Sequence, residues 1–222
     1  MMGDEFSLHC AAILFDLDGV LVDSAACIER TWHRWSVDHK LDPSQVIETA
    51  HGRRTIETLQ LVAPHLNAEQ EIAALAEIES NTMEGVFEVP GAHALIQRLP
   101  PTSWAVVTSG LRRIATRRLR HVGLPIPGVL VCADDLQRGK PDPEGYLAAA
   151  ARLGVAAAAC VVIEDAPAGI AAGRAAGMRT IAVRGTYGRE ALAAADYGVS
   201  HLAALQVGLF DGTLLEVRAV PT

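Results

Sequence analysis

The chain has 222 residues, 50% of them hydrophobic, and a formal net charge of -7 at pH 7. This length and composition can bury the core of one large domain or of two smaller ones. The acidic balance excludes nucleic acid and an anionic membrane surface as main partners, because both are negatively charged themselves. An anionic small substrate would need a local positive site.

Membrane contact and secretion are not expected either. The apolar stretches fall short of the ~20 residues that a membrane-spanning helix requires. Asp4 and Glu5 stand where a signal peptide would carry Lys or Arg, so we expect a cytoplasmic protein. The cysteines are far apart without a C-x-x-C pair, which predicts buried, reduced thiols rather than disulfides or a zinc site. They are Cys10, Cys27, Cys132 and Cys160.

The first predicted element is a strand over residues 11–16. Its continuous apolar run is typical of a strand buried on both faces of a parallel sheet, and it leads into Asp16-Leu17-Asp18-Gly19. With Leu17 pointing the other way, alternation directs Asp16 and Asp18 to one side, and Gly19 lets the backbone turn. Ligands of open α/β sheets bind at strand ends, so two carboxylates are predicted to converge there. Alone, such a pair is more often typical of solvated strand-end residues that begin a loop.

The next segment, up to about residue 89, predicts helices and no strand. Ser24 is expected to cap a helix that runs to His39. Further helices are predicted at 45–49, 55–62 and 68–83.

Beyond Val89-Pro90-Gly91 the pattern changes to alternating strands and helices. The predicted strands are 104–108, 129–132, 160–164 and 179–183. The predicted helices are 92–99, 112–122, 144–153 and 169–176. This alternation predicts an α/β fold, a Rossmann-like parallel sheet with helices on both faces. The first strand belongs to the same sheet, so residues 1–22 and 90–222 would form the core and residues 23–89 an inserted α-helical cap.

Two later segments complete the reading of the chain. Asp211-Gly212 between apolar runs predicts a hairpin over 205–217 at an edge of the sheet. The helix at 112–122 is rich in arginine without interleaved aromatic residues, so we interpret it as a solvated face rather than a nucleic-acid site. Its arginines are Arg112, Arg113, Arg117, Arg118 and Arg120.

Other strand ends carry polar groups as well. Thr108-Ser109-Gly110 offers hydroxyls and free N–H groups to an anion, and Lys140 stands in a proline-stiffened loop. Four acids at one sheet edge would repel one another, and a Mg²⁺ ion with oxygen ligands resolves this. Those acids are Asp16, Asp18, Glu164 and Asp165. Lys140, Thr108 and Ser109 would then hold the oxygens of a bound phosphate.

This ordered set of motifs resembles the haloacid dehalogenase superfamily, on its phosphatase side. The resemblance implies that Asp16 is the nucleophile and that Asp18 protonates the leaving alcohol and later activates water. It implies Mg²⁺ ligands at Asp16, the backbone carbonyl of Asp18 and Asp165, with Glu164 as a ligand or its partner. An acid at position 18 also argues against dehalogenation. The motifs begin at Asp16, Val107, Lys140 and Glu164.

The cap carries the segment that should choose the substrate. His51-Gly52-Arg53-Arg54-Thr55 is similar to a segment of the sugar- and polyol-phosphate phosphatases, which include glycerol-phosphate and deoxyglucose-phosphate phosphatases. In that resemblance Arg54, together with Arg53 and His51, would bind hydroxyls of the leaving group. We therefore expect a monomeric, Mg²⁺-dependent phosphatase that hydrolyses small phosphate esters of sugars or polyols through an aspartyl-phosphate.

Two other functions remain open on the sequence. A phosphosugar mutase of the β-phosphoglucomutase type would share the fold, but His51 and Thr55 stand where those enzymes place a Lys and an Arg. Without that grip on a second phosphate, water should reach the phosphoenzyme first. A catalytically silent binding domain is the third reading, and the presence of every expected catalytic group argues against it.

Overall fold

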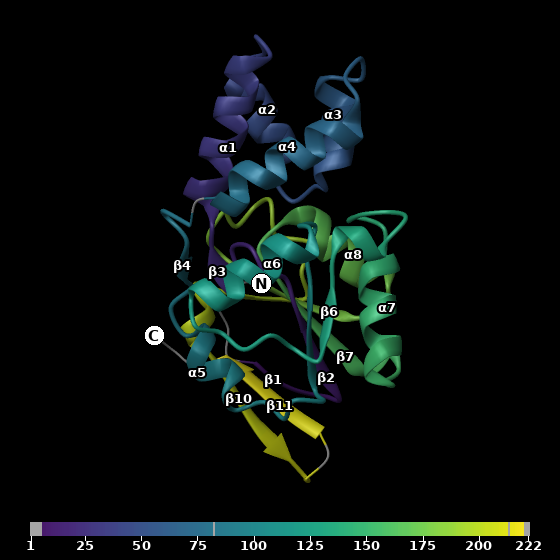
Figure 1. Cartoon of the computed structure of the whole chain (residues 1–222). Helices are drawn as coiled ribbons and strands as arrows, with labels where there is room; N and C mark the ends of the chain where they lie inside the picture. Colours follow the sequence, from purple (N-terminus) through teal and green to yellow (C-terminus); the bar gives the residue numbers. More distant parts are fainter. Residues whose placement is uncertain (1–5, 82, 213, 220–222) are drawn as a thin grey trace.

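The computed structural model describes residues 6–81, 83–212 and 214–219. Within these ranges six parallel strands form the central sheet (Figure 1). Their order is β6 (Val129–Val131), β5 (Trp104–Val107), β2 (Ala12–Phe15), β7 (Cys160–Glu164), β8 (Arg179–Val183) and β9 (Tyr197–Val199). Every residue of β2, β5 and β7 is buried, as expected of parallel strands covered on both faces. The predicted α/β fold is confirmed; β9 is an addition to it.

Helices cover the two faces of this sheet. They are α5 (Ala92–Ile96), α6 (Arg112–His121), α7 (Glu144–Leu153) and α8 (Pro167–Ala175). Side chains alternate along β2: Phe15 packs in one core cluster with Leu119 of α6. Leu14 packs in another with Tyr146 of α7. The period-two pattern of a strand thus divides the core into two layers.

The register of the sheet sets where the functional side chains meet. Phe15 lies opposite Val106 on one side and Ile163 on the other. The residues that follow these partners are therefore at one edge of the sheet, and they include Asp16, Thr108 and Glu164.

A helical group stands over that edge (Figure 1), and we call it the cap. It consists of α1 (Ala25–Asp38), α2 (Pro43–Ala50), α3 (Thr55–Val62) and α4 (Ala68–Asn81). The cap has an apolar core of its own, which includes Trp32, Trp35, Leu59 and Leu75. Residue 82, within the predicted helix 68–83, lies outside the described residues, as do Asp4 and Glu5.

Short strands join the cap to the sheet domain. β3 (Val22–Asp23) pairs antiparallel with β4 (Phe87–Glu88) where the chain enters and leaves the cap. The prediction of no strand up to residue 89 is wrong at β4, because two residues are too few to show a periodic pattern. No helix within the described ranges is long and apolar enough to cross a membrane.

The C-terminal hairpin forms at the predicted turn but not at the predicted place. β10 (Leu205–Phe210) and β11 (Leu214–Ala219) flank Asp211-Gly212, and β11 also pairs with β1 (Ser7–Cys10). The result is an antiparallel sheet of order β1-β11-β10, separate from the parallel one. β1 alternates exposed and buried residues, so the hairpin joins a half-buried partner rather than an edge of the main sheet.

All four cysteines fall within the described residues. They are buried, as the sequence predicted.

Candidate active site

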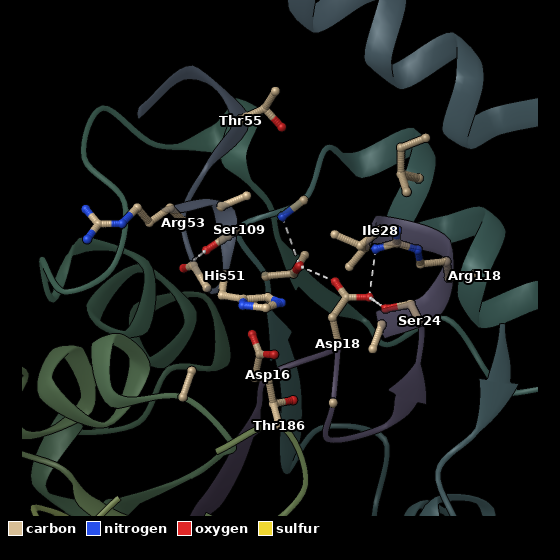
Figure 2. Close-up of a pocket in the computed structure, with 18 of the residues that line it drawn as sticks. Asp16, Asp18, Ser24, Ile28, His51, Arg53, Thr55, Ser109, Arg118 and Thr186 are labelled. Atoms are coloured by element: carbon tan, nitrogen blue, oxygen red, sulfur yellow. Dashed lines mark hydrogen bonds and ion pairs between the residues drawn. The ribbon is translucent and has the colours of Figure 1, made fainter. Parts of the chain in front are cut away.

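A cavity of about 150 Å³ lies between the strand ends and the cap (Figure 2). Seven predicted core residues line it: Asp16, Asp18, Thr108, Ser109, Lys140, Glu164 and Asp165. His51 and Arg53 of the cap line it too. The structure therefore brings together the strand ends that the sequence singled out.

Lys140 holds the floor of this cavity together. Its ammonium group donates to a carboxylate oxygen of Asp16, to Oε1 of Glu164 at 2.7 Å and to the carbonyl of Val107 at 3.1 Å. Burial alone would lower the pKa of Lys140, but Asp16 and Glu164 raise it well above its ordinary value. Lys140 is thus a buried cation beside the carboxylate of Asp16.

Glu164 is fixed from several sides. Oε1 accepts from Lys140 and from the hydroxyl of Tyr146 at 2.9 Å, and Oε2 accepts from the N–H groups of Asp165 and Ala166 at 3.0 and 3.1 Å. Burial, followed by the charge of Glu164, raises the pKa of Tyr146 well above its usual value, so its hydroxyl stays a donor. The sequence did not identify Tyr146 as a site residue, because an aromatic residue within an apolar predicted helix is ordinarily a core residue.

The acidic groups at the sheet edge fit a divalent cation. Among the described residues, one carboxylate oxygen each of Asp16, Glu164 and Asp165 lie within 4.8 Å of one another. Burial raises the pKa of Asp16 well above its usual value, and burial together with Glu164 raises that of Asp165 to about 7. One ammonium group cannot neutralise this many carboxylates. Hard oxygen donors in excess of the local positive charge are a donor set for Mg²⁺.

Two further residues shape this acidic group. Gly19 has φ +88°, and a Cβ there would lie 2.0 Å from Oδ2 of Asp165, so a side chain at position 19 would displace the carboxylate. The hydroxyl of Thr186, in the loop after β8, donates to Oδ2 of Asp165 at 2.5 Å. Thr186 was missed by the sequence argument because its loop carries no recognisable motif.

The carboxyl group of Asp18 lies apart from that acidic group. Its Oδ1 accepts from Ser24 Oγ at 2.6 Å and from Arg118 Nη1 at 2.7 Å, and Oδ2 faces Thr108 Oγ1 at 3.5 Å. Figure 2 shows the Asp18 side chain directed at Ser24 and Arg118. The expected convergence of four side-chain carboxylates is therefore wrong for Asp18, whose backbone carbonyl remains a predicted ligand. Ser24 is the N-cap residue of α1, but its side chain makes no capping hydrogen bond, because its hydroxyl donates to Asp18 instead.

Arg118 corrects the interpretation of the arginine-rich helix. Arg113, Arg117 and Arg120 are exposed, as predicted, but Arg118 is buried and lines the cavity. It lies four residues after the buried Ile114 and next to Leu119, so the helical period already places it on the apolar face. Burial alone would lower the pKa of Arg118, but Asp18 and Glu79 raise it, so it stays a cation.

The cap segment divides into two parts. His51 and Arg53 both line the cavity, but the Arg53 side chain extends away from Asp16 and Asp18 (Figure 2). The hydroxyl of Ser109 donates to the carbonyl of Gly52 at 3.1 Å, which joins the core to the cap at this point.

The sequence predicted that Arg54 binds the leaving group, but Arg54 does not line the cavity. It is buried, and its guanidinium donates to the carbonyls of Leu136 and Gln137 at 3.0 and 2.9 Å and to Glu57 at 2.7 Å. Glu57 in turn accepts from the N–H of Gly139 at 3.1 Å. Arg54 therefore attaches the cap to the loop that precedes Lys140, because the carbonyls of that loop match its fork of donors.

Replacing Arg54 by Ala is expected to loosen that attachment. The variant loses hydrogen bonds to two core carbonyls, and we expect a stability loss of about 2 kcal/mol and faster amide hydrogen exchange in residues 136–140. The exposed neighbour is the matched control, and Arg53→Ala should change neither quantity. Equal exchange rates in the two variants would show that Arg54 does not hold the loop.

Comparison with known proteins agrees with this geometry. The family model of the haloacid dehalogenase-like hydrolases matches residues 10–177. Hexitol phosphatase A of Escherichia coli (strain K12) is 44% identical over 185 residues, covering 79% of this chain and 84% of that protein.

Two proteins of Saccharomyces cerevisiae are similar over most of their length. Glycerol-1-phosphate phosphohydrolase 2 is 36% identical, covering 96% of this chain and 91% of that protein. 2-deoxyglucose-6-phosphate phosphatase 1 is 34% identical, covering 87% and 89%. The resemblance to this group of phosphatases is thereby confirmed. The chain belongs to the haloacid dehalogenase-like hydrolases.

Proposed function

We propose that the protein is a Mg²⁺-dependent phosphatase that hydrolyses phosphate monoesters of sugars or polyols through an aspartyl-phosphate on Asp16. The observation that carries this proposal is the buried Asp16 with Lys140 against it, in a cavity that Thr108 also lines. The relatives support the substrate class, since they are named for a hexitol, for glycerol 1-phosphate and for 2-deoxyglucose 6-phosphate.

The chemistry takes two displacements at phosphorus. In the first, a carboxylate oxygen of Asp16 bonds to phosphorus, the bond to the ester oxygen breaks, and Asp18 gives that oxygen a proton. In the second, water bonds to phosphorus, its proton passes to Asp18, and the bond between Asp16 and phosphorus breaks. The products are the free alcohol and inorganic phosphate, and both aspartates return to their starting states.

The remaining groups hold the phosphate and the cation. Lys140, Thr108 and Ser109 would bind phosphoryl oxygens, and Glu164 fixes Lys140 in place. Asp16, Asp165 and the backbone carbonyl of Asp18 would hold Mg²⁺, which when bound supplies positive charge at a phosphoryl oxygen. His51 and Arg53 are the cap residues we propose to meet the sugar or polyol.

A panel of phosphate esters tests the function. Sugar, polyol and nucleotide monophosphates are incubated with and without Mg²⁺, and inorganic phosphate is measured. We expect release from sugar or polyol phosphates, dependent on Mg²⁺, at least about tenfold faster than from nucleotides. Conversion of a sugar 1-phosphate to its 6-phosphate faster than phosphate release would instead identify a mutase.

The pKa of Asp165 predicts how the metal should affect stability. In the metal-free protein this pKa is raised from 3.8 to about 7. The folded state then binds more protons than the unfolded state between these values, so stability from this group is present below about pH 4 and lost as the pH rises to about 7. We expect Mg²⁺ to raise Tm more at about pH 8 than at about pH 5.

The matched variant for this measurement is Asp165→Asn. It should lose most of the Mg²⁺-dependent rise in Tm and flatten the pH dependence of the metal-free protein. A Tm that Mg²⁺ raises equally in both proteins would place the cation elsewhere.

A further inference from the structure

A buried ion pair connects Asp18 with the cap. Arg118 of α6, with a side chain only 3% exposed, lies 2.7 Å from Oδ1 of Asp18 through Nη1 and 3.5 Å from Glu79 Oε2 through Nη2. Glu79 belongs to α4 of the cap, which packs against α6. One guanidinium therefore contacts a carboxylate of the core and a carboxylate of the cap.

The contacts of Asp18 differ between its two oxygens. Both short hydrogen bonds, from Ser24 and Arg118, end on Oδ1. Oδ2 faces Thr108 at 3.5 Å, on the side of the cavity where the phosphate would be held. Asp18 stands between β2 and the turn at residues 19–21, where its backbone bridges to Val22. Without the two donors its carboxyl group could still rotate about the side-chain bonds.

We propose that Arg118 is a positioning residue, which together with Ser24 binds Oδ1 of Asp18 so that Oδ2 faces the leaving group, and which Glu79 orients from the cap. This inference rests on the proposed phosphatase function. The O–H bond on Oδ2 breaks as the ester oxygen leaves phosphorus, and Oδ2 takes a proton back from the attacking water. Arg118 keeps its own protons in both steps.

Two consequences follow for the reaction. Arg118 should matter when the leaving group needs a proton and much less when it does not. Glu79 reaches the guanidinium only through α4 of the cap. Arg118 should therefore hold Asp18 in place more firmly when the cap packs against the core.

The test compares two phosphate esters that differ in their leaving group. One is the best alkyl phosphate from the substrate panel, whose alkoxide needs a proton, and the other is p-nitrophenyl phosphate, whose phenolate does not. We expect Arg118→Met to lower kcat for the alkyl ester about 100-fold and for the aryl ester less than about tenfold. KM should change less than about threefold for both.

Further variants separate positioning from folding. Arg118→Lys keeps the charge, so it should recover at least part of the alkyl-ester activity and remain folded if Arg118→Met does not. Glu79→Gln should show the same preference for the aryl ester with a smaller loss. Arg117→Met, an exposed arginine on the same helix, should leave both substrates unchanged. Thermal unfolding of each variant confirms that it is folded at the assay temperature.

Several results would overturn the proposal. Equal losses for the two esters in a folded variant would mean that Arg118 does not act through proton transfer, and a loss confined to KM would make it a substrate ligand. Failure of the proposed function is distinguishable, because the unmodified protein would then release phosphate from neither ester.

Discussion

Asp16→Asn is expected to lower kcat for phosphate release by about 10⁴-fold or more. An amide oxygen is a poor nucleophile, and uncatalysed hydrolysis of a phosphate monoester is among the slowest reactions known, so the rate should fall steeply without the Asp16 carboxylate. Burial raises the pKa of Asp16 well above its usual value, so a neutral side chain of the same shape should fit there. Thermal unfolding should show a folded variant.

The control for this variant is an acid from the same cavity. Asp23 is exposed and lines the cavity, and Asp23→Asn should keep kcat within about twofold of the unmodified protein. The two measurements share substrate, cation and pH. If Asp16→Asn retains a tenth of the activity, Asp16 is not the nucleophile.

Lys140→Met should destabilise the fold as well as remove activity. Breaking a buried ion pair by removing one partner costs about 3–5 kcal/mol, because the other charge stays buried. Here both Asp16 and Glu164 lose their cation. Urea unfolding at pH 7 should show a loss in this range, and phosphate release should fall about 10³-fold or more as the phosphoryl charge is no longer balanced.

The sign of the pH dependence follows from Asp16. Lys140 lowers the pKa of that carboxyl against the effect of burial, so its removal raises the pKa further. A group whose pKa is raised in the folded state stabilises the protein at low pH, and that stability is lost as the pH rises. The destabilisation of Lys140→Met should therefore grow as the pH rises through the raised pKa of Asp16, which lies well above 3.8.

Arg138→Met is the matched variant for Lys140. Arg138 stands two residues earlier in the same loop, is exposed, and pairs with Asp142 at 3.1 Å. Such a surface pair is worth about 0–1 kcal/mol. Similar stability losses in the two variants would mean that the buried pairs of Lys140 are not what holds the floor of the cavity.

The sequence predicted the elements with strong local patterns. Strands 160–164 and 179–183 and helices 55–62 and 144–153 have the predicted bounds in the structure. Their apolar runs are bounded by turn residues, which makes the pattern unambiguous. β3 and β4 have two residues each and β9 has three. Strands this short form because tertiary partners are available to pair with them. Two or three residues are too few to show a periodic pattern.

The residues of the candidate site that follow strands of the sheet could be predicted from the sequence, whereas the contacts that helices and the cap make around them could not. Asp16, Thr108 and Glu164 follow buried strands of one sheet, so topology alone brings them together. Arg118 meets Asp18 across 100 residues of sequence. The helical period places Arg118 on the apolar face of its helix, but no sequence pattern indicates which partner it meets there. Arg54 likewise donates hydrogen bonds to backbone carbonyls of the core. Backbone carbonyls are present at every residue, so no sequence pattern identifies these partners.

A direct test of the central claim is to trap the phosphoenzyme. The protein is mixed with its best sugar or polyol phosphate and Mg²⁺, quenched in acid during turnover, digested, and analysed by mass spectrometry. We predict one phosphoryl group on the peptide that contains Asp16, absent without substrate and absent in Asp16→Asn. A phosphoryl group on another residue, or turnover without any phosphoenzyme at the earliest quench times, would contradict the account.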